Sequence, residues 1–295
     1  MPPVDTVKSL AALGKSHEMA EEAQDSQASD TLSGSESQEV GKRKASSARV
    51  VHEVVRLQGD DELNRPVISL ALSGLAAGVA ITASVFAQAA IALRLGGEPW
   101  AELVAGLGYA VGFVIVVMGR MQLFTETTVT AVLPVISNPN WHNFGRLARL
   151  WSIVLAANLL GTFMVAAGIA SGAIVTEDMR AAIIQLSGHL VGPAPIDVLG
   201  RAIPAGFLVA SIAWLLPSAR GQELGVIIVI TWLIAIGGFA HVIASSTEIW
   251  TLLLLGQIDL ATAIGGFLLP ALIGNVIGGT FLFAVLANGQ VKAEL

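Results

Sequence analysis

The residue best suited to chemistry is His241, the one histidine in an apolar stretch that covers residues 225–255. As a single helix this stretch would reach about 46 Å, against about 30 Å of hydrocarbon in a bilayer. Gly237 and Gly238 lie just before the histidine, so we expect two half-helices that meet inside the membrane. Unwound backbone is tolerated there only beside protein or a water-filled cavity. His241 is therefore a candidate pore residue; the plain alternative is a core histidine bonded to a neighbouring helix.

Four charged side chains also fall within apolar segments, where charges are costly and usually line a cavity or pair with each other: Arg120, Glu126, Arg201 and Glu248. We expect Arg120 to meet Glu126, although six residues is a poor helical spacing, which requires residues 122–125 to be unwound. Arg120 could then face the pore or belong to a purely structural pair. Arg201 and Glu248 fall towards the outer leaflet, where they either pair or extend to the interface.

Composition indicates a polytopic membrane protein. Hydrophobic residues make up 54% of the 295 residues, charged residues 13%, and the mean hydropathy is +0.72. The chain has no cysteine, which excludes disulfides and thiolate sites, and we expect no metal and no cofactor. No basic stripe points to nucleic acid. No hydrolase motif is present, so we expect no enzyme and no catalytic residues.

The chain divides into four predicted parts. Residues 1–48 are polar and lack aromatic side chains, which predicts a disordered tail. Residues 49–65 predict an amphipathic helix at the membrane surface, with Val51, Val55 and Leu57 opposite His52 and Arg56. Residues 66–288 contain six apolar segments that form the transmembrane domain, and residues 289–295 are a second tail.

The second apolar segment, residues 105–136, is also too long for one span and is interrupted near Arg120. Broken helices at matching positions of two halves indicate an internal repeat with the site between them. Because each half has three spans, the second half would be inverted. Basic residues gather before residue 66, near the start of the third span, at Arg220 and at Lys292. This bias predicts that both termini are cytoplasmic.

Two short motifs carry a family resemblance. Residues 122–125, Gln-Leu-Phe-Thr, resemble the signature in the broken second helix of the formate/nitrite transporter family. Residues 238–241, Gly-Phe-Ala-His, resemble its Gly-Phe-Glu-His signature in the fifth helix. Residues 140–141 and 158–161 resemble the segment around the third helix. Residues 63–66 and Arg120 resemble a branch of bacterial inner-membrane proteins, the YfdC-like proteins.

The resemblance implies an all-α, aquaporin-like protomer with six helices, assembled as a homopentamer in the bacterial inner membrane. Each protomer would hold a pore for small monovalent weak-acid anions, moved as the anion or as the neutral acid. By position, Leu123 and Phe124 form one apolar constriction and Ile234 contributes to the other, with Phe239 in the second signature. Thr125 and His241 would lie between the constrictions.

The sequence departs from the family pattern at Ala240, where the family has a glutamate, and at Ser245, where it has an asparagine. Two alternatives to an anion pore therefore stay open: a scaffold or sensor that transports nothing, and a pore for small neutral solutes.

A bare anion loses its hydration shell in an apolar constriction, so the pore must offer donors or positive charge, or the anion must cross with a proton. His241 suits both routes because an imidazole changes charge near neutral pH. Thr125 could donate to the anion or orient the ring, or its hydroxyl could simply bond its own helix.

Overall fold

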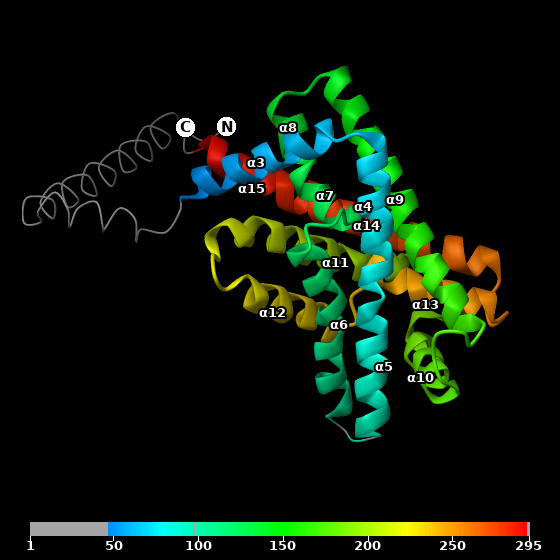
Figure 1. The fold of residues 1–295 in the computed structure, drawn as a ribbon. Helices are drawn as coiled ribbons and strands as arrows, with labels where there is room; N and C mark the ends of the chain where they lie inside the picture. The colour runs from blue at the N-terminus through cyan, green and yellow to red at the C-terminus, as the bar shows by residue number, and fades with distance from the viewer. Residues whose placement is uncertain (1–46, 97, 99, 294–295) are drawn as a thin grey trace, which may run out of the picture. The chain divides into compact units, whose positions relative to one another are not determined.

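The computed structural model describes residues 47–96, 98 and 100–293, which fold into helices joined by short connections (Figure 1). The predicted disordered tail, residues 1–48, lies almost wholly outside the described residues. The α-helices are α3 (Ala48–Asn64), α4 (Val67–Ile81), α5 (Ala83–Leu95), α6 (Ala101–Met118), α7 (Phe124–Thr130), α8 (Val132–Ser137), α9 (Trp141–Ala170), α10 (Glu177–Ser187), α11 (Pro195–Leu215), α12 (Glu223–Ile236), α13 (Val242–Leu254), α14 (Leu269–Val276) and α15 (Val285–Ala293). Short 3-10 or π-helical turns η1 (Gly188–Leu190), η2 (Leu216–Ser218), η3 (Thr262–Leu268) and η4 (Ile277–Ala284) extend them.

The apolar segments match the predicted spans. Five described helices are long and apolar enough to cross a membrane: Val67–Leu95, Ala101–Met118, Trp141–Ala170, Pro195–Ser218 and Thr262–Ala293. The second predicted segment is α6 followed by α7 and α8, and the fifth is α12 followed by α13. Both predicted breaks are therefore present. The last helix continues to Ala293, so most of the predicted C-terminal tail is helical.

The two broken helices end in the same way. Residues 120 and 121 donate their N–H groups to the carbonyls of residues 117 and 116, and residues 238 and 239 donate to those of residues 235 and 234. These are the two bonds of a Schellman motif, which needs a left-handed residue just past the helix. Gly238 fills that position with φ 61°, and Arg120 fills it with φ 55°.

Each break is held by one buried asparagine. Asn158 of α9 accepts a hydrogen bond from the Phe124 N–H (2.9 Å) and donates to the carbonyls of Gln122 (2.9 Å) and Gly74 (2.7 Å). The side chain thereby caps α7 and ties the unwound stretch to α4. Without it, several backbone groups would be buried and unpaired, at a cost of about 1–3 kcal/mol each.

Asn275 of α14 repeats this arrangement in the second half. It accepts from the Val242 N–H (2.8 Å) and donates to the carbonyls of Ala240 (2.9 Å) and Ala202 (2.8 Å). The cap bonds join residues 34 apart in the first half and 33 apart in the second. The two halves thus stabilise their breaks with the same side-chain chemistry.

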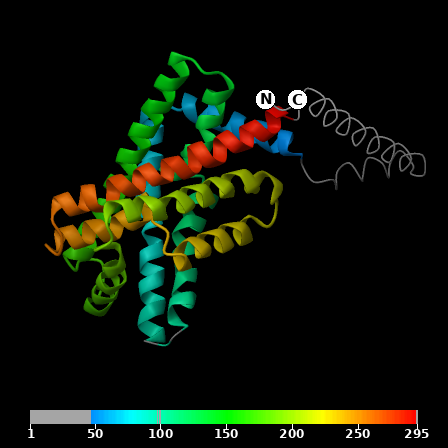
Figure 2. The same cartoon turned by 180° about the vertical axis from the view of Figure 1, so that it is seen from behind.

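Glycines let the asparagine-bearing helices approach closely. α4 packs along α9, and the helix that contains α14 and α15 runs along α11 (Figures 1 and 2). A β-carbon at Gly78 would clash with the Asn158 carbonyl, and one at Gly206 would clash with the Asn275 carbonyl. Such backbone approach through small residues is how helices associate in lipid.

The N-terminal helix α3 buries Val51 and Val55, as predicted, but two other residues differ from the prediction. His52 was expected on the polar face, but it is buried, its Nε2 lies 3.2 Å from the Asn288 Oδ1, and its ring meets Trp214 edge-on. Leu57, expected on the apolar face, is 49% exposed. The prediction for His52 was wrong because α11 and α15 offer it both a ring and an amide partner.

Candidate functional site

The site centres on a contact between the two broken helices. Nε2 of His241, which precedes α13, lies 2.7 Å from the Thr125 Oγ1 in the first turn of α7. Both side chains are completely buried. The fold brings them together although they are 116 residues apart in the sequence. The structure thus joins the two residues that the sequence predicted between the constrictions.

A second hydrogen bond defines the proton position on the His241 ring. Its Nδ1 accepts the Ala244 N–H at 3.0 Å and so caps α13. A backbone N–H can only donate, so Nδ1 carries no proton while this bond exists. In the neutral ring the proton is then on Nε2, which donates to the Thr125 hydroxyl oxygen.

The Thr125 hydroxyl keeps its own proton free. Thr127 and Thr128 donate their hydroxyls to the carbonyls of Phe124 and Thr125, in the usual way for threonines in a helix (2.7 Å each). Thr125 makes no such bond among the described residues. Its O–H is therefore a donor that the protein leaves available beside the imidazole.

The apolar residues expected to form the two constrictions lie in the protein interior. Leu123, Phe124 and Ile234 are buried, and Phe124 packs edge-on against Trp151 at 5.7 Å between ring centres. Phe113 was not predicted, and its ring meets the His241 ring edge-on at 5.1 Å. Its position on α6 could not be distinguished in the sequence from ordinary core positions.

Phe239 lies in the second break, half-buried over a small cavity of about 20 Å³. That volume is enough for about one water molecule. Arg201 and Ala240 line the same cavity, and the Ala240 N–H donates to the Arg201 carbonyl. Arg201 thus lies beside the second break.

The expected pairing of Arg120 with Glu126 is wrong. No ion pair or hydrogen bond joins their side chains, both of which the structure describes, and Arg120 is exposed. Arg120 occupies the left-handed position that ends α6, and Leu123 is extended where the chain enters α7, so the two residues belong to separate helices. Glu126 is half-buried, with Arg120 and Glu62 as the charged groups that act on it electrostatically.

Arg201 and Glu248 also form no ion pair in the described part of the chain. Glu248 is 7% exposed and contacts the Ser187 hydroxyl, whereas Arg201 is exposed. Of the two alternatives for this pair, mutual pairing is therefore ruled out. Glu248 remains as a buried carboxyl group without a cation partner.

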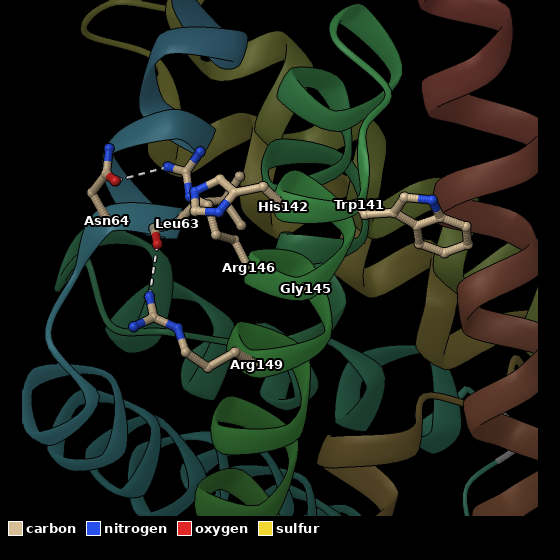
Figure 3. A pocket seen from close by; sticks show the side chains of 7 residues that line it. All are labelled: Leu63, Asn64, Trp141, His142, Gly145, Arg146 and Arg149. Atoms are coloured by element: carbon tan, nitrogen blue, oxygen red, sulfur yellow. Dashed lines mark hydrogen bonds between the residues drawn. The ribbon is translucent and has the colours of Figure 1, made fainter.

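A larger pocket, of about 470 Å³, lies where α3 meets the start of α9. In Figure 3 two arginines of α9 point into it towards the end of α3. Arg146 donates to Asn64 (2.8 Å) and pairs with Asp60 (3.1 Å), and Arg149 donates to the Leu63 carbonyl (2.7 Å). These bonds attach α3 to α9, which gives both arginines a structural role.

Comparison with known proteins gives concordant results. The family model described as formate/nitrite transporter matches residues 49–288. The chain is 40% identical to the inner membrane protein YfdC of Escherichia coli (strain K12) over 253 residues, which cover 86% of this chain and 82% of that protein. It is 26% identical over 236 residues to the formate channel FocA of the same strain, covering 69% and 82%. A solved structure of a pentameric formate channel with formate bound superimposes with a TM-score of 0.68 at 19% identity, covering 77% of this chain and 98% of that one.

Proposed function

The chain belongs to the formate/nitrite transporter family, and we propose that it forms a membrane pore for small monovalent weak acids, with His241 and Thr125 as its selective centre. One observation carries the proposal: a buried threonine hydroxyl, oriented by a buried imidazole, keeps its proton free in an otherwise apolar region. A single donor at that place suits a small acceptor that must leave water.

The role of each centre residue follows from its hydrogen bonds. The His241 Nε2–H donates a hydrogen bond to the Thr125 hydroxyl oxygen. This bond orients the hydroxyl, whose own O–H stays free to donate to a cargo molecule. Protonation of His241 at Nδ1 would break the cap on Ala244. The ring therefore serves best as a neutral orienting group, and the pore supplies donors rather than a full positive charge.

This arrangement favours movement of the cargo with a proton. A single neutral hydroxyl offsets only part of the cost of removing an anion from water, which is many kcal/mol. A neutral acid brings no charge into the apolar constrictions at Leu123, Phe124 and Ile234. Its carbonyl or equivalent oxygen accepts a hydrogen bond from the Thr125 O–H.

The assembly and orientation belong to the same proposal. The matched asparagines 158 and 275 support two inverted repeats, and the pentameric structural neighbour supports a homopentamer. The name of the relative YfdC supports the bacterial inner membrane, and the loop charges support cytoplasmic termini. In this orientation α3 lies on the cytoplasmic side.

Uptake by the purified protein in proteoliposomes tests the function. The panel contains formate, nitrite, acetate and hydrosulfide, with protein-free vesicles as the baseline. We expect flux above baseline for at least one weak acid, rising as the pH falls and the neutral acid becomes more abundant. Baseline flux for every acid would favour a scaffold or sensor, and flux confined to uncharged solutes such as urea would favour a neutral-solute pore.

A further inference from the structure

The pocket between α3 and α9 has no part in the proposed pore. Its volume of about 470 Å³ falls in the range of about 300–1,000 Å³ that is usual for small-molecule sites. The end of α3 forms one side, and the other side is the first three turns of α9, which contribute His142, Arg146 and Arg149 (Figure 3). No acidic residue belongs to this lining. The pocket is therefore suited to an anion.

Two helices that can span a membrane begin beside this pocket. α4 begins at Val67, just after the end of α3, and α9 begins at Trp141. The 30 residues of α9 extend about 45 Å, against about 30 Å of hydrocarbon, so about ten of them lie outside the hydrocarbon. Trp141 and Phe144, which are 92% and 48% exposed, mark the first turns as the interfacial part. The pocket thus lies at the depth of the lipid headgroups.

Arg146 is occupied by the protein itself. Its Nη2 pairs with the Asp60 carboxylate at 3.1 Å and donates to the Asn64 side chain at 2.8 Å. Its Nη1 donates to the Asn143 side chain at 3.1 Å. Asp60 therefore neutralises this arginine, which serves as a wall of the pocket.

Arg149 has no counter-ion in the part of the chain that the structure describes. Its Nη2 donates to the carbonyls of Leu63 (2.7 Å) and Arg65 (3.2 Å), whereas its Nη1 and Nε find no acceptor there. The exposed His142 ring likewise makes no hydrogen bond to any described residue. The pocket thus offers about one uncompensated positive charge together with free N–H donors.

We propose that this pocket binds the phosphodiester headgroup of an anionic phospholipid. Oxygens of the phosphodiester accept hydrogen bonds from Nη1 and Nε of Arg149 and from a ring N–H of His142. A phosphodiester carries one negative charge, which matches the one uncompensated guanidinium, whereas a phosphate monoester carries about two. The exposed side chains of Val67 and Ile68 at the start of α4 offer apolar surface to the acyl chains.

The proposed orientation places this pocket at the cytoplasmic leaflet, where basic pockets between membrane helices recognise anionic headgroups. The site is independent of the cargo that the pore carries. A lipid bound here would join the first turns of α9 to the end of α3 through one headgroup, in addition to the bonds of the two arginines.

The test is native mass spectrometry of the full chain, purified in detergent, with added phosphatidylglycerol or with the zwitterionic phosphatidylcholine. Gly145 is the position to change, because it lines the pocket and a β-carbon there would meet no atom within 4 Å. Gly145→Glu brings a negative charge into the pocket and should weaken phosphatidylglycerol binding about fivefold. Gly145→Lys should strengthen it by about the same factor, and phosphatidylcholine binding should stay unchanged in both variants.

Gly225→Glu is the matched control. Gly225 is also an exposed glycine in the first turn of a helix, α12, with open space for a β-carbon, but it does not line the pocket. This variant should bind phosphatidylglycerol as the wild type does. Equal weakening in Gly225→Glu and Gly145→Glu would assign the effect to net charge and overturn the site.

Two further results would also overturn the proposal. Phosphatidylglycerol binding that neither Gly145 substitution changes would show that the lipid binds elsewhere on the protein. Displacement of phosphatidylglycerol by inorganic phosphate would make the pocket a site for free phosphate instead of a lipid. Because binding is measured without transport, absence of flux through the pore would leave the lipid site intact.

Discussion

Arg120 and Gly238 adopt the same left-handed backbone conformation at equivalent points of the two breaks, with φ of 55° and 61°. Each follows a helix-ending glycine and donates its N–H to a carbonyl three residues back. Glycine adopts a left-handed conformation without steric strain, whereas a residue with a β-carbon is strained in it. The break at Arg120 therefore contains backbone strain that the break at Gly238 lacks.

Replacing Arg120 by glycine should stabilise the protein by about 1 kcal/mol, because the strain is relieved at a site where the exposed side chain makes no ion pair. The apparent melting temperature of the detergent-solubilised protein measures this. Arg120→Ala removes the same charge but keeps the β-carbon, so it should show no gain. Equal gains in both variants would assign the effect to charge instead of backbone strain.

The two asparagines should be equally intolerant of a change that keeps their shape. Asn158→Asp and Asn275→Asp each replace an amide that donates to two carbonyls, so each should cost about 2–5 kcal/mol. Thermal unfolding of both variants checks this. Asn140→Asp is the control, since aspartate keeps the cap on α9 and loses only one exposed hydrogen bond to the Asn138 carbonyl, so it should have a small effect. A mild effect at Asn275 alone would show that the second break is held differently.

Docking of α3 should depend on pH through Glu62. Burial raises the pKa of this carboxyl above 4.5, against the opposing influence of hydrogen bonds from Thr130 and Gln122 and the charge of Arg65. A raised pKa means that the docked state holds the proton more tightly, so docking is strongest below pH 4.5 and weakens as the pH rises through the raised value.

Hydrogen exchange of the α3 amides, corrected for intrinsic rates, should therefore show less protection at pH 8 than at pH 5. Glu62→Gln keeps an acceptor and removes the charge, and it should make protection independent of pH. The same pH dependence in Glu62→Gln would mean that another group near α3 titrates.

His241 has a structural role besides its proposed one in the pore. His241→Phe loses the cap on Ala244 and should cost about 1 kcal/mol, whereas His241→Asn offers a good capping side chain and should recover most of it. Both variants lose the Nε2–H that orients Thr125, so both should lose selective flux. Full flux in His241→Asn would show that the cap alone matters.

The sequence predicted the helical segments and both breaks, because length, hydrophobicity and glycine are local signals. It did not reveal Asn275, whose role depends on a bond to residues 33 and 35 positions away. Comparing the halves from each break onward would have found it, since Asn158 follows its own break at almost the same spacing. The spacing alone could not settle the partner of Arg120, because the left-handed turn at this residue is not visible in a helical periodicity.

One other expectation failed for a related reason. His52 was assigned to a polar surface by periodicity, yet its partners Trp214 and Asn288 come from the distant helices α11 and α15. Phe113 looks like a core residue in the sequence, and only the position of His241 gives it a polar neighbour. Local sequence patterns could not reveal side-chain roles that depend on helices distant in the sequence.

In the proposed pore, the free hydroxyl of Thr125 is the donor that admits the cargo. This role is tested by the initial rate of formate uptake into proteoliposomes by Thr125→Val, which keeps the shape of the side chain and removes the O–H. Thr127→Val is the matched control, because its hydroxyl is buried but bonded to its own helix. We expect a loss of about tenfold or more in Thr125→Val and a near wild-type rate in Thr127→Val. Equal rates in the two variants would contradict it.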